Sequence, residues 1–176
     1  MPRIAPADWT FRVWGAVEQP VTLDWAQLER MPRRDVLCDI HCVTQWSRFD
    51  NLFAGVSVPD VLALARPTAA ATHVLVHADP DYTTNLPLAD LAAPGTLLAT
   101  HWNTEPLSAE HGGPVRLLVP HLYLWKSAKW VRGFELLTDD WPGFWEQNGY
   151  HMRGDPWREE RYGRPDPVRM RRGKSR

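Results

Sequence analysis

Hydrophobic and polar residues alternate with a period of two in several short segments, which is typical of half-buried β-strands. The first such segment, residues 11–17, ends before Pro20 and predicts an opening strand. Residues 35–40 predict a second strand, in which Val36, Cys38 and Ile40 share one apolar face. Further strands are predicted at residues 73–77, 82–86, 97–100, 115–119 and 130–137.

Two segments carry helix signals. Asp24 is followed three residues later by Gln27, a capping-box pattern that predicts a short helix ending before Pro32. The sequence Ser57-Val58-Pro59-Asp60 predicts a second helix that ends before Pro67. From residue 139 onward, aromatic residues occur without sustained periodicity, so we expect ordered irregular chain wrapping the core. The predicted fold class is α+β, mainly β.

The composition favours a loop-rich globular protein. The 176 residues are 44% hydrophobic and 11% aromatic, which argues against disorder, and ten Trp with sixteen Pro argue against long helices. No internal repeat or low-complexity linker divides the chain. We therefore predict a single domain over residues 1–162.

Charge is distributed unevenly. Residues 153–176 hold nine Lys and Arg against four Asp and Glu, which leaves eleven against seventeen in the rest, so the end carries about +5 and the body about −6. A basic terminus can bind nucleic acid or an anionic membrane, but it is more often a solvated end. We predict a basic, disordered tail over residues 163–176 and no nucleic-acid partner.

No hydrophobic run approaches the ~20 residues that a membrane-spanning helix needs, and the first eight residues lack the apolar core of a signal peptide. We therefore predict no membrane span and a cytoplasmic location. Two cysteines do not form a disulfide framework, and thiols in a reducing compartment stay free for packing, metal binding or catalysis.

The two cysteines are expected to differ in role. Cys38 lies in the apolar row of its strand and is predicted to be core, whereas Cys42 follows the strand end and precedes a turn at residues 43–47, so its sulfur can face a pocket. Cys42 could be an inert thiol, a nucleophile, a redox thiol or a soft-metal ligand. His41 lies on the opposite face of the strand, which does not support a nucleophile, and zinc would need a second ligand pair.

Two later segments suit an anion. One is His111-Gly112-Gly113-Pro114-Val115-Arg116, in which the glycines allow close backbone approach to a ligand and Arg116 offers a bidentate fork. The other is Lys126-Ser127-Ala128-Lys129-Trp130, which adds charge and a hydroxyl. The alternative is that Arg116 and Lys129 form surface ion pairs on adjacent strands.

Together, residues 42–47, 111–116 and 126–130 resemble the sulfite oxidase superfamily of molybdopterin-dependent oxidoreductases, in particular its small bacterial sulfite oxidase-like members. The resemblance extends from about Trp9 to Tyr162. It implies a sulfite oxidase-type molybdopterin-binding catalytic domain, a molybdenum-molybdopterin cofactor and two-electron oxygen-atom transfer. It also implies that Cys42 ligates molybdenum and that the cofactor contacts His41, His111, Arg116, Lys126, Ser127, Ala128 and Lys129.

The substrate implied by the resemblance is small and neutral. Sulfite-oxidising members carry arginines soon after the metal cysteine, whereas here residues 43–47 read Val-Thr-Gln-Trp-Ser, as in the methionine sulfoxide reductase branch. A neutral pocket containing Trp46, Tyr82 or Trp102 suits an S-oxide or N-oxide better than a dianion. We therefore assign Trp46 and Tyr82, with Cys42, as candidate catalytic residues.

The chain has no haem-attachment motif, so we expect an external electron-transfer partner, a haem or flavin protein. Related proteins usually have a further segment before the first strand that helps to enclose the cofactor, and here the chain begins almost at that strand. This difference leaves a catalytically idle pterin-binding scaffold as one alternative. A metal-free, cysteine-dependent enzyme is another.

Overall fold

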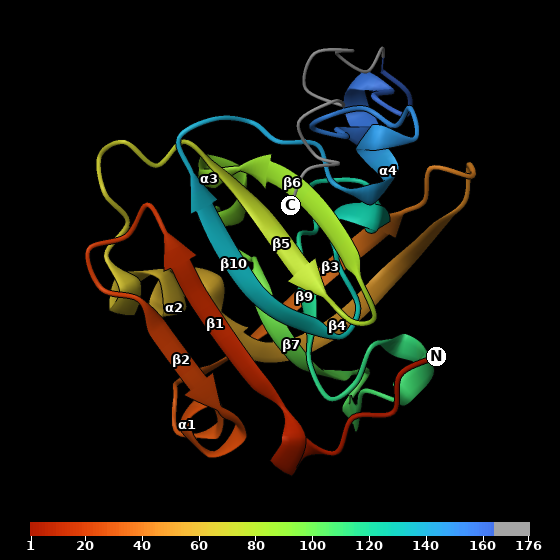
Figure 1. The fold of residues 1–176 in the computed structure, drawn as a ribbon. Helices are drawn as coiled ribbons and strands as arrows, with labels where there is room; N and C mark the ends of the chain where they lie inside the picture. Colours follow the sequence, from red (N-terminus) through yellow and green to blue (C-terminus); the bar gives the residue numbers. More distant parts are fainter. Residues whose placement is uncertain (164–176) are drawn as a thin grey trace.

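The computed structural model describes residues 1–163 and contains two β-sheets (Figure 1). The first sheet has the order β2-β1-β10-β5-β6; β1 and β10 run parallel, and the other pairs are antiparallel. The second sheet has the order β3-β4-β7-β8, with β9 also paired to β7. The strands are β1 Thr10–Gly15, β2 Val21–Asp24, β3 Arg33–His41, β4 Ser47–Ser57, β5 His73–Ala78, β6 Tyr82–Pro87, β7 Leu97–Trp102, β8 Glu105–Pro106, β9 Arg116–Leu118 and β10 Val131–Leu137.

The helices are short, and strands outnumber them within residues 1–163, as predicted. The α-helices are α1 Trp25–Glu29, α2 Val58–Ala65, α3 Leu88–Leu91 and α4 Phe144–Gln147, and the 3₁₀ turns are η1 Pro6–Asp8, η2 Ala109–His111, η3 Leu124–Lys126 and η4 Pro156–Arg158. The predicted capping box is confirmed, because Asp24 accepts from the Gln27 amide and the Gln27 side chain accepts from the Asp24 amide. The helix predicted to open at residues 57–60 is α2.

Two clusters of buried side chains hold the sheets. The larger lies against the first sheet and includes Trp9, Phe11 and Phe134, with the ring centroids of Phe11 and Phe134 4.8 Å apart. The smaller is built on the second sheet around Ile40 and Phe53, and Cys38 packs against it. The apolar face predicted for residues 36–40 is therefore confirmed.

Several elements were absent from the sequence-based prediction. The turn after Cys42 is confined to residues 43–45, and the chain then re-enters the sheet at Ser47, where β4 pairs with β3. The short strands β2 and β8 and the helix α3 were also missed. β2 and β8 are only four and two residues long, and pairing with β1 and β7 determines their conformation. α3 has only four residues, too few for a helical period to show in the sequence.

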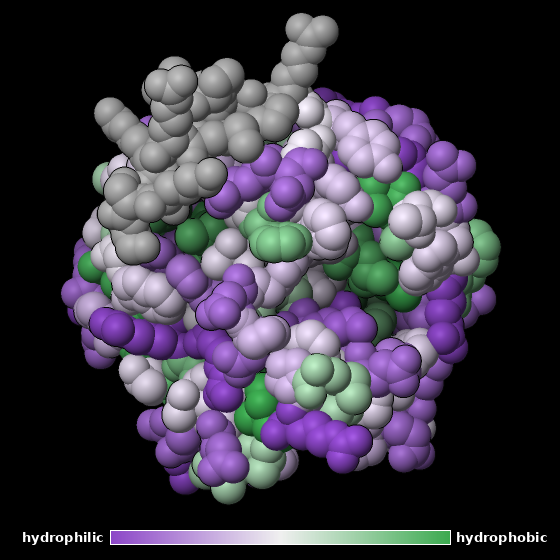
Figure 2. Space-filling view, turned by 45° about the vertical axis from the view of Figure 1, so that its right-hand side comes forward, coloured by the Kyte–Doolittle hydropathy of each residue, from purple (hydrophilic) through white to green (hydrophobic). Residues whose placement is uncertain are grey.

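The surface presents no membrane-spanning element among the described residues: none of their helices is long and apolar enough to cross a bilayer. On the face shown in Figure 2, hydrophobic side chains form separate patches among polar ones. The predicted tail lies outside the described residues, apart from Gly163.

Candidate functional site

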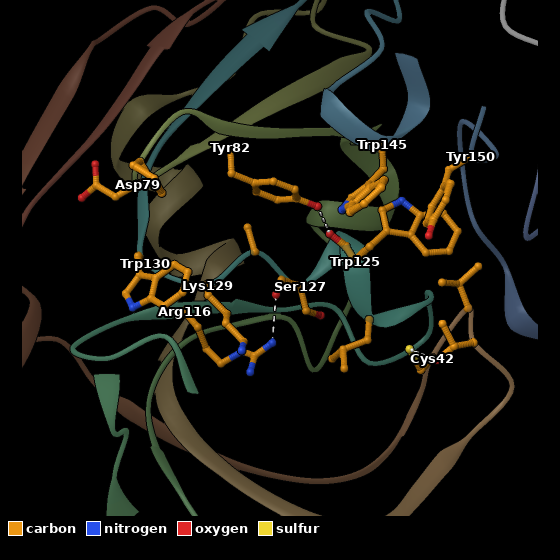
Figure 3. A pocket seen from close by; sticks show the side chains of 15 residues that line it. Cys42, Asp79, Tyr82, Arg116, Trp125, Ser127, Lys129, Trp130, Trp145 and Tyr150 are labelled. Atoms are coloured by element: carbon orange, nitrogen blue, oxygen red, sulfur yellow. Dashed lines mark hydrogen bonds between the residues drawn. The ribbon is translucent and has the colours of Figure 1, made fainter. Parts of the chain in front are cut away.

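A cavity of about 530 Å³ lies beside Cys42, and aromatic side chains form much of its wall (Figure 3). In Figure 3 Cys42 lies toward one end, near Tyr150, while Asp79 and Trp130 lie toward the other. The volume is in the range of small-molecule and cofactor sites. The lining residues are Cys42, Val43, Thr44, Asp79, Pro80, Tyr82, Arg116, Leu124, Trp125, Ser127, Ala128, Lys129, Trp130, Trp145 and Tyr150.

Cys42 is half-buried and stands at the first position of the turn between β3 and β4. Its amide donates to the Trp46 carbonyl at 2.9 Å, and its carbonyl accepts from the Gln45 amide at 3.1 Å. The sulfur lies 3.1 Å from the Thr44 hydroxyl oxygen. Backbone hydrogen bonds therefore fix the turn, and the thiol is directed into the cavity, as expected from its place after the strand end.

Arg116 is a buried cation in the cavity wall. Its Nη1 donates to the His111 carbonyl at 3.2 Å and its Nη2 to the Ser127 carbonyl at 2.9 Å, while the buried Nε has no partner. No carboxylate of residues 1–163 forms an ion pair with it, and burial lowers the pKa of Arg116 to about 10. A buried, uncompensated cation is costly, which favours an anionic ligand at this point.

Lys129 brings a second positive charge to the same wall. Its Nζ donates to the Glu110 carbonyl at 2.7 Å. Burial and the nearby Arg116 guanidinium lower the pKa of Lys129, and Glu110 opposes that shift. The repulsion between the two cations would be relieved by an anion between them, so the geometry favours the predicted anion site over the alternative of separate surface ion pairs.

Ser127 and Ala128 also line the cavity, as the resemblance implies, and Figure 3 shows Ser127 between Arg116 and Cys42. The Ser127 hydroxyl accepts from the Val119 amide at 2.9 Å, and the Ala128 carbonyl accepts from the Leu117 amide at 2.8 Å. Their backbone is therefore anchored to the chain around β9.

Lys126 is not brought to the cavity. Its side chain is fully buried, and its Nζ lies 2.7 Å from Glu146 Oε1, with further bonds to the carbonyls of Asn85 and Met152. Lys126 was predicted to contact the cofactor, but its charge is paired with the Glu146 carboxylate, which α4 brings from a distant part of the sequence. The structure gives Lys126 a supporting role behind the wall.

His41 and His111 also lie outside the cavity lining. His41 Nδ1 is 2.8 Å from the Ser47 hydroxyl, and its ring packs against Trp157. His111 Nδ1 lies 2.8 Å from the Ser108 hydroxyl, and the ring lines a separate hollow of about 370 Å³. The link from His111 to the Cys42 cavity is its backbone carbonyl, which accepts a hydrogen bond from Arg116.

Of the aromatic residues assigned to the pocket, only Tyr82 lines it. Its hydroxyl donates to the Trp125 carbonyl at 2.6 Å, and burial raises the pKa of Tyr82, so the phenol stays protonated. Trp46 is 48% exposed and contributes its carbonyl to the Cys42 amide. Trp102 packs on Phe53 and does not line the cavity.

The two glycines serve chain packing, which corrects the expectation that they admit a ligand. A Cβ on Gly112, whose φ is +98°, would lie 2.7 Å from the Lys129 Cβ, and one on Gly113 would lie 2.1 Å from the Leu107 carbonyl oxygen. The loop thus carries glycine because it passes close to its neighbours.

Sequence reasoning missed Trp125, Trp145 and Tyr150, which form the aromatic wall near Cys42. The rings of Trp125 and Tyr150 meet edge to face at 5.0 Å, and those of Trp145 and Tyr150 stack at 4.9 Å. For Trp145 and Tyr150, the signal available was the aromatic content after residue 139. That content could not show which rings face the cavity, because the segment has no periodicity.

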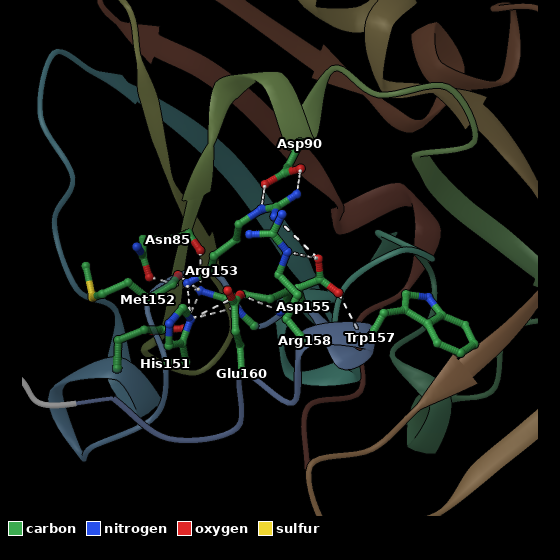
Figure 4. A network of polar contacts seen from close by, with 12 residues as sticks. Asn85, Asp90, His151, Met152, Arg153, Asp155, Trp157, Arg158 and Glu160 are labelled. Carbon is green, nitrogen blue, oxygen red and sulfur yellow. Dashed lines mark hydrogen bonds and ion pairs between the residues drawn. The ribbon is translucent and has the colours of Figure 1, made fainter.

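The C-terminal segment that carries Tyr150 is anchored by a polar network (Figure 4). Arg153 contacts Asp90 through Nε at 2.8 Å and Nη2 at 3.1 Å, and His121 Nε2 lies 3.2 Å from the same carboxylate. Burial alone would raise the pKa of Asp90, but Arg153 and then His121 bring it below its ordinary value.

This shift predicts a pH dependence. Because the folded state favours ionised Asp90, its contribution to stability is complete above the unfolded pKa of about 4 and is lost as the pH falls through the folded value. We expect Asp90→Asn to be less stable than wild type at pH 7 and the difference to shrink below about pH 4. Urea unfolding across this range measures it; a difference that stays constant into acid would contradict the assignment.

The chemistry of the site fits an anionic cofactor that carries a soft metal. A thiol is the soft ligand, and Arg116 and Lys129 match a phosphate or a similar anion. Arg116 in particular has a buried Nε without a partner. The site therefore has the donor types that a metal-bearing, phosphorylated organic cofactor requires.

Comparison with known proteins agrees with a site for a metal-bearing organic cofactor. The profile of the oxidoreductase molybdopterin binding domain family matches residues 1–145. The chain is 49% identical over 154 residues to YuiH, an uncharacterised oxidoreductase of Bacillus subtilis (strain 168), covering 88% of this chain and 78% of YuiH. It is 30% identical over 174 residues to the protein-methionine-sulfoxide reductase catalytic subunit MsrP of Gluconobacter oxydans (strain 621H), covering 86% of this chain and 55% of MsrP.

The fold is also found in a solved structure. The sulfane dehydrogenase SoxCD from Paracoccus pantotrophus matches with a TM-score of 0.72 and 22% identity, over 78% of this chain and 40% of that one. The chain thus has the strand-rich fold of the sulfite oxidase-like superfamily, as the resemblance implied. It belongs to the oxidoreductase molybdopterin binding domain family and is a molybdenum-dependent oxidoreductase with a molybdopterin cofactor.

Proposed function

We propose that Cys42 ligates molybdenum and that the enzyme reduces a small, neutral sulfoxide by two-electron oxygen-atom transfer. The observation that carries this proposal is the position of the Cys42 thiol in an aromatic cavity. Among the residues that the structure describes, the cations that line this cavity are Arg116 and Lys129, which lie together on one wall. When bound, the cofactor supplies the redox change and accepts the oxygen atom. Arg116, Lys129 and the backbone of Ser127 and Ala128 would hold its anionic part.

The neutral substrate class is supported by the position of Arg48. This arginine follows Cys42 by six residues, but its guanidinium lies over the Trp102 ring, 4.2 Å from the ring centroid, beside the separate hollow near His111. It therefore does not line the cavity as a partner for a dianion. The relative MsrP is named a methionine sulfoxide reductase, which agrees with a sulfoxide.

The reaction consumes one sulfoxide, two electrons and two protons, and it releases one sulfide and one water. Tyr82, Trp125 and Tyr150 would exclude bulk water from the substrate, and the protonated Tyr82 phenol can orient the sulfoxide oxygen or a water molecule. The electrons must come from a separate reduced haem or flavin protein. MsrP is called a catalytic subunit, which agrees with such a division of labour.

The proposed function is tested by comparing substrates. We expect the loaded enzyme, with a reduced viologen dye as electron donor, to reduce methyl sulfoxides and to show no oxidation of sulfite with an electron acceptor. Turnover with sulfite and none with any sulfoxide or N-oxide would overturn the proposal. A protein that binds the cofactor but turns over none of these compounds would be the idle scaffold.

Tyr82 and Trp46 provide a matched pair of variants. We expect Tyr82→Ala to change kcat/KM by about tenfold or more and to alter the order of preference among sulfoxides, because a cavity wall is lost. Trp46→Ala should leave that order unchanged, because the exposed indole lies outside the lining and its backbone contact to Cys42 remains. Molybdenum content is measured in both variants. An identical order of preference in Tyr82→Ala and wild type would contradict the assignment.

A further inference from the structure

The segment after residue 148 returns to the Cys42 turn from more than a hundred residues away. In Figure 1 this C-terminal segment lies beside the far end of β3 and β4. Arg161 Nη1 donates to the Val43 carbonyl at 2.7 Å and to the Cys42 carbonyl at 3.2 Å. The turn is thus held from within by its own amides and from outside by one guanidinium.

Arg161 is itself fixed before it reaches the turn. Its Nε donates to the Glu159 carboxylate at 2.7 Å, and its guanidinium lies over the ring of buried Tyr123 at 4.9 Å. Its backbone carbonyl accepts from the His151 amide at 3.2 Å. Glu159 and the Tyr123 ring thus hold the planar Arg161 guanidinium in one orientation, and its remaining edge donates to the carbonyls of the Cys42 turn. A guanidinium fixed in this way can hold those carbonyls in place.

We infer that Arg161 is a positioning residue that sets the orientation of the Cys42 thiol toward the metal. This inference rests on the proposed ligation of molybdenum by Cys42. The family profile ends at residue 145, so Arg161 lies beyond the residues that this profile matches.

The mechanism is mechanical restraint of the turn. The Cys42 carbonyl belongs to the peptide unit that links Cys42 to Val43, and the Val43 carbonyl belongs to the next unit, so one donor on both carbonyls restricts rotation of the two peptide units that follow the thiol residue. Loss of the guanidinium leaves the hydrogen bonds within the turn but removes this outside restraint. The thiol would then sample orientations that do not suit the metal.

Arg161→Met tests the inference, with Arg158→Met as the matched control. Arg158 lies on the same segment, is 71% exposed and contacts Asp155 instead of the turn. Hydrogen exchange of the full chain as purified reports on the turn directly, since the Cys42 and Gln45 amides are bonded within it. We expect exchange in residues 42–46 to be about tenfold faster in Arg161→Met and unchanged in Arg158→Met.

The loaded enzyme supplies the second readout. We expect Arg161→Met to lower kcat by about tenfold with KM within about twofold, and to shift the electron paramagnetic resonance signal of the molybdenum. Exchange, kcat and signal all equal to wild type would overturn the inference, as would the same changes in Arg158→Met. If Arg161→Met does not fold, Glu159→Gln removes the carboxylate that orients the guanidinium, and it should show smaller changes in the same direction.

The two proposals fail in different ways. Wild-type protein without molybdenum, made in a host that synthesises the cofactor, would overturn ligation by Cys42. The exchange measurement would still show whether Arg161 holds the turn. Normal molybdenum content and sulfoxide turnover with unaltered exchange in Arg161→Met would instead overturn the positioning role alone.

Discussion

Cys42→Ser is expected to lose its molybdenum and to lower sulfoxide turnover by more than about 100-fold. Replacing a residue that only orients a metal ligand typically costs about 10–100-fold, so loss of the ligand itself should cost more. A serine hydroxyl is also a harder and less acidic ligand than a thiol. Elemental mass spectrometry gives the metal content, and fluorescence of released pterin gives the cofactor content. Both are measured on wild type and variant from a host able to make the cofactor.

Cys38→Ser is the matched control. Cys38 packs against the smaller core cluster, and burial, with a contribution from Asp39, raises the pKa of its thiol to about 11. It does not line the cavity, so the variant should keep its metal and its turnover. Full metal content and turnover in Cys42→Ser would contradict the proposed ligation. Turnover that requires Cys42 in a metal-free wild type would instead support the metal-free cysteine enzyme.

Glu146→Ala is expected to lower the free energy of unfolding by about 3–5 kcal/mol, the usual cost of leaving one partner of a buried ion pair alone. Glu146 Oε1 accepts from Lys126 at 2.7 Å, from Trp125 at 2.8 Å and from Thr84 at 2.9 Å, and both charged side chains are fully buried. Burial lowers the pKa of Lys126 and Glu146 opposes this, so the variant leaves a buried cation without its counter-charge. Urea unfolding measures the change.

Two further variants separate charge from packing. Glu18→Ala removes the carboxylate of an exposed pair with Arg66 and should change stability little. Lys126→Met combined with Glu146→Leu removes both buried charges and should recover part of the loss, because an apolar replacement of a buried pair is often tolerated. A stability of Glu146→Ala equal to wild type would contradict the role given to this pair. The cavity wall should also loosen, since Trp125 loses its acceptor.

Local patterns in the sequence determined most of the elements. Alternation predicted the first strand and β3, short runs of strand-favouring residues predicted β5, β6, β7, β9 and β10, and the Asp24–Gln27 capping box predicted α1. These signals act over a few residues, so they can be read without the fold. The start of β4 at Ser47 could not be read in this way, because it depends on pairing with β3 across the Cys42 turn.

The features of the candidate site also fall into two groups, those that the sequence determined and those that only the structure decided. The sequence determined that Cys42 follows a strand end and that Arg116 and Lys129 offer charge for an anion, because these are properties of residue type and local position. Only the tertiary structure decided that Lys126 is paired with Glu146, that His111 and Trp46 lie outside the cavity, and that Trp145 and Tyr150 wall it. The physical reason is that counter-charges, burial and ring contacts come from segments distant in sequence. Arg161, 119 residues after Cys42, is the extreme case.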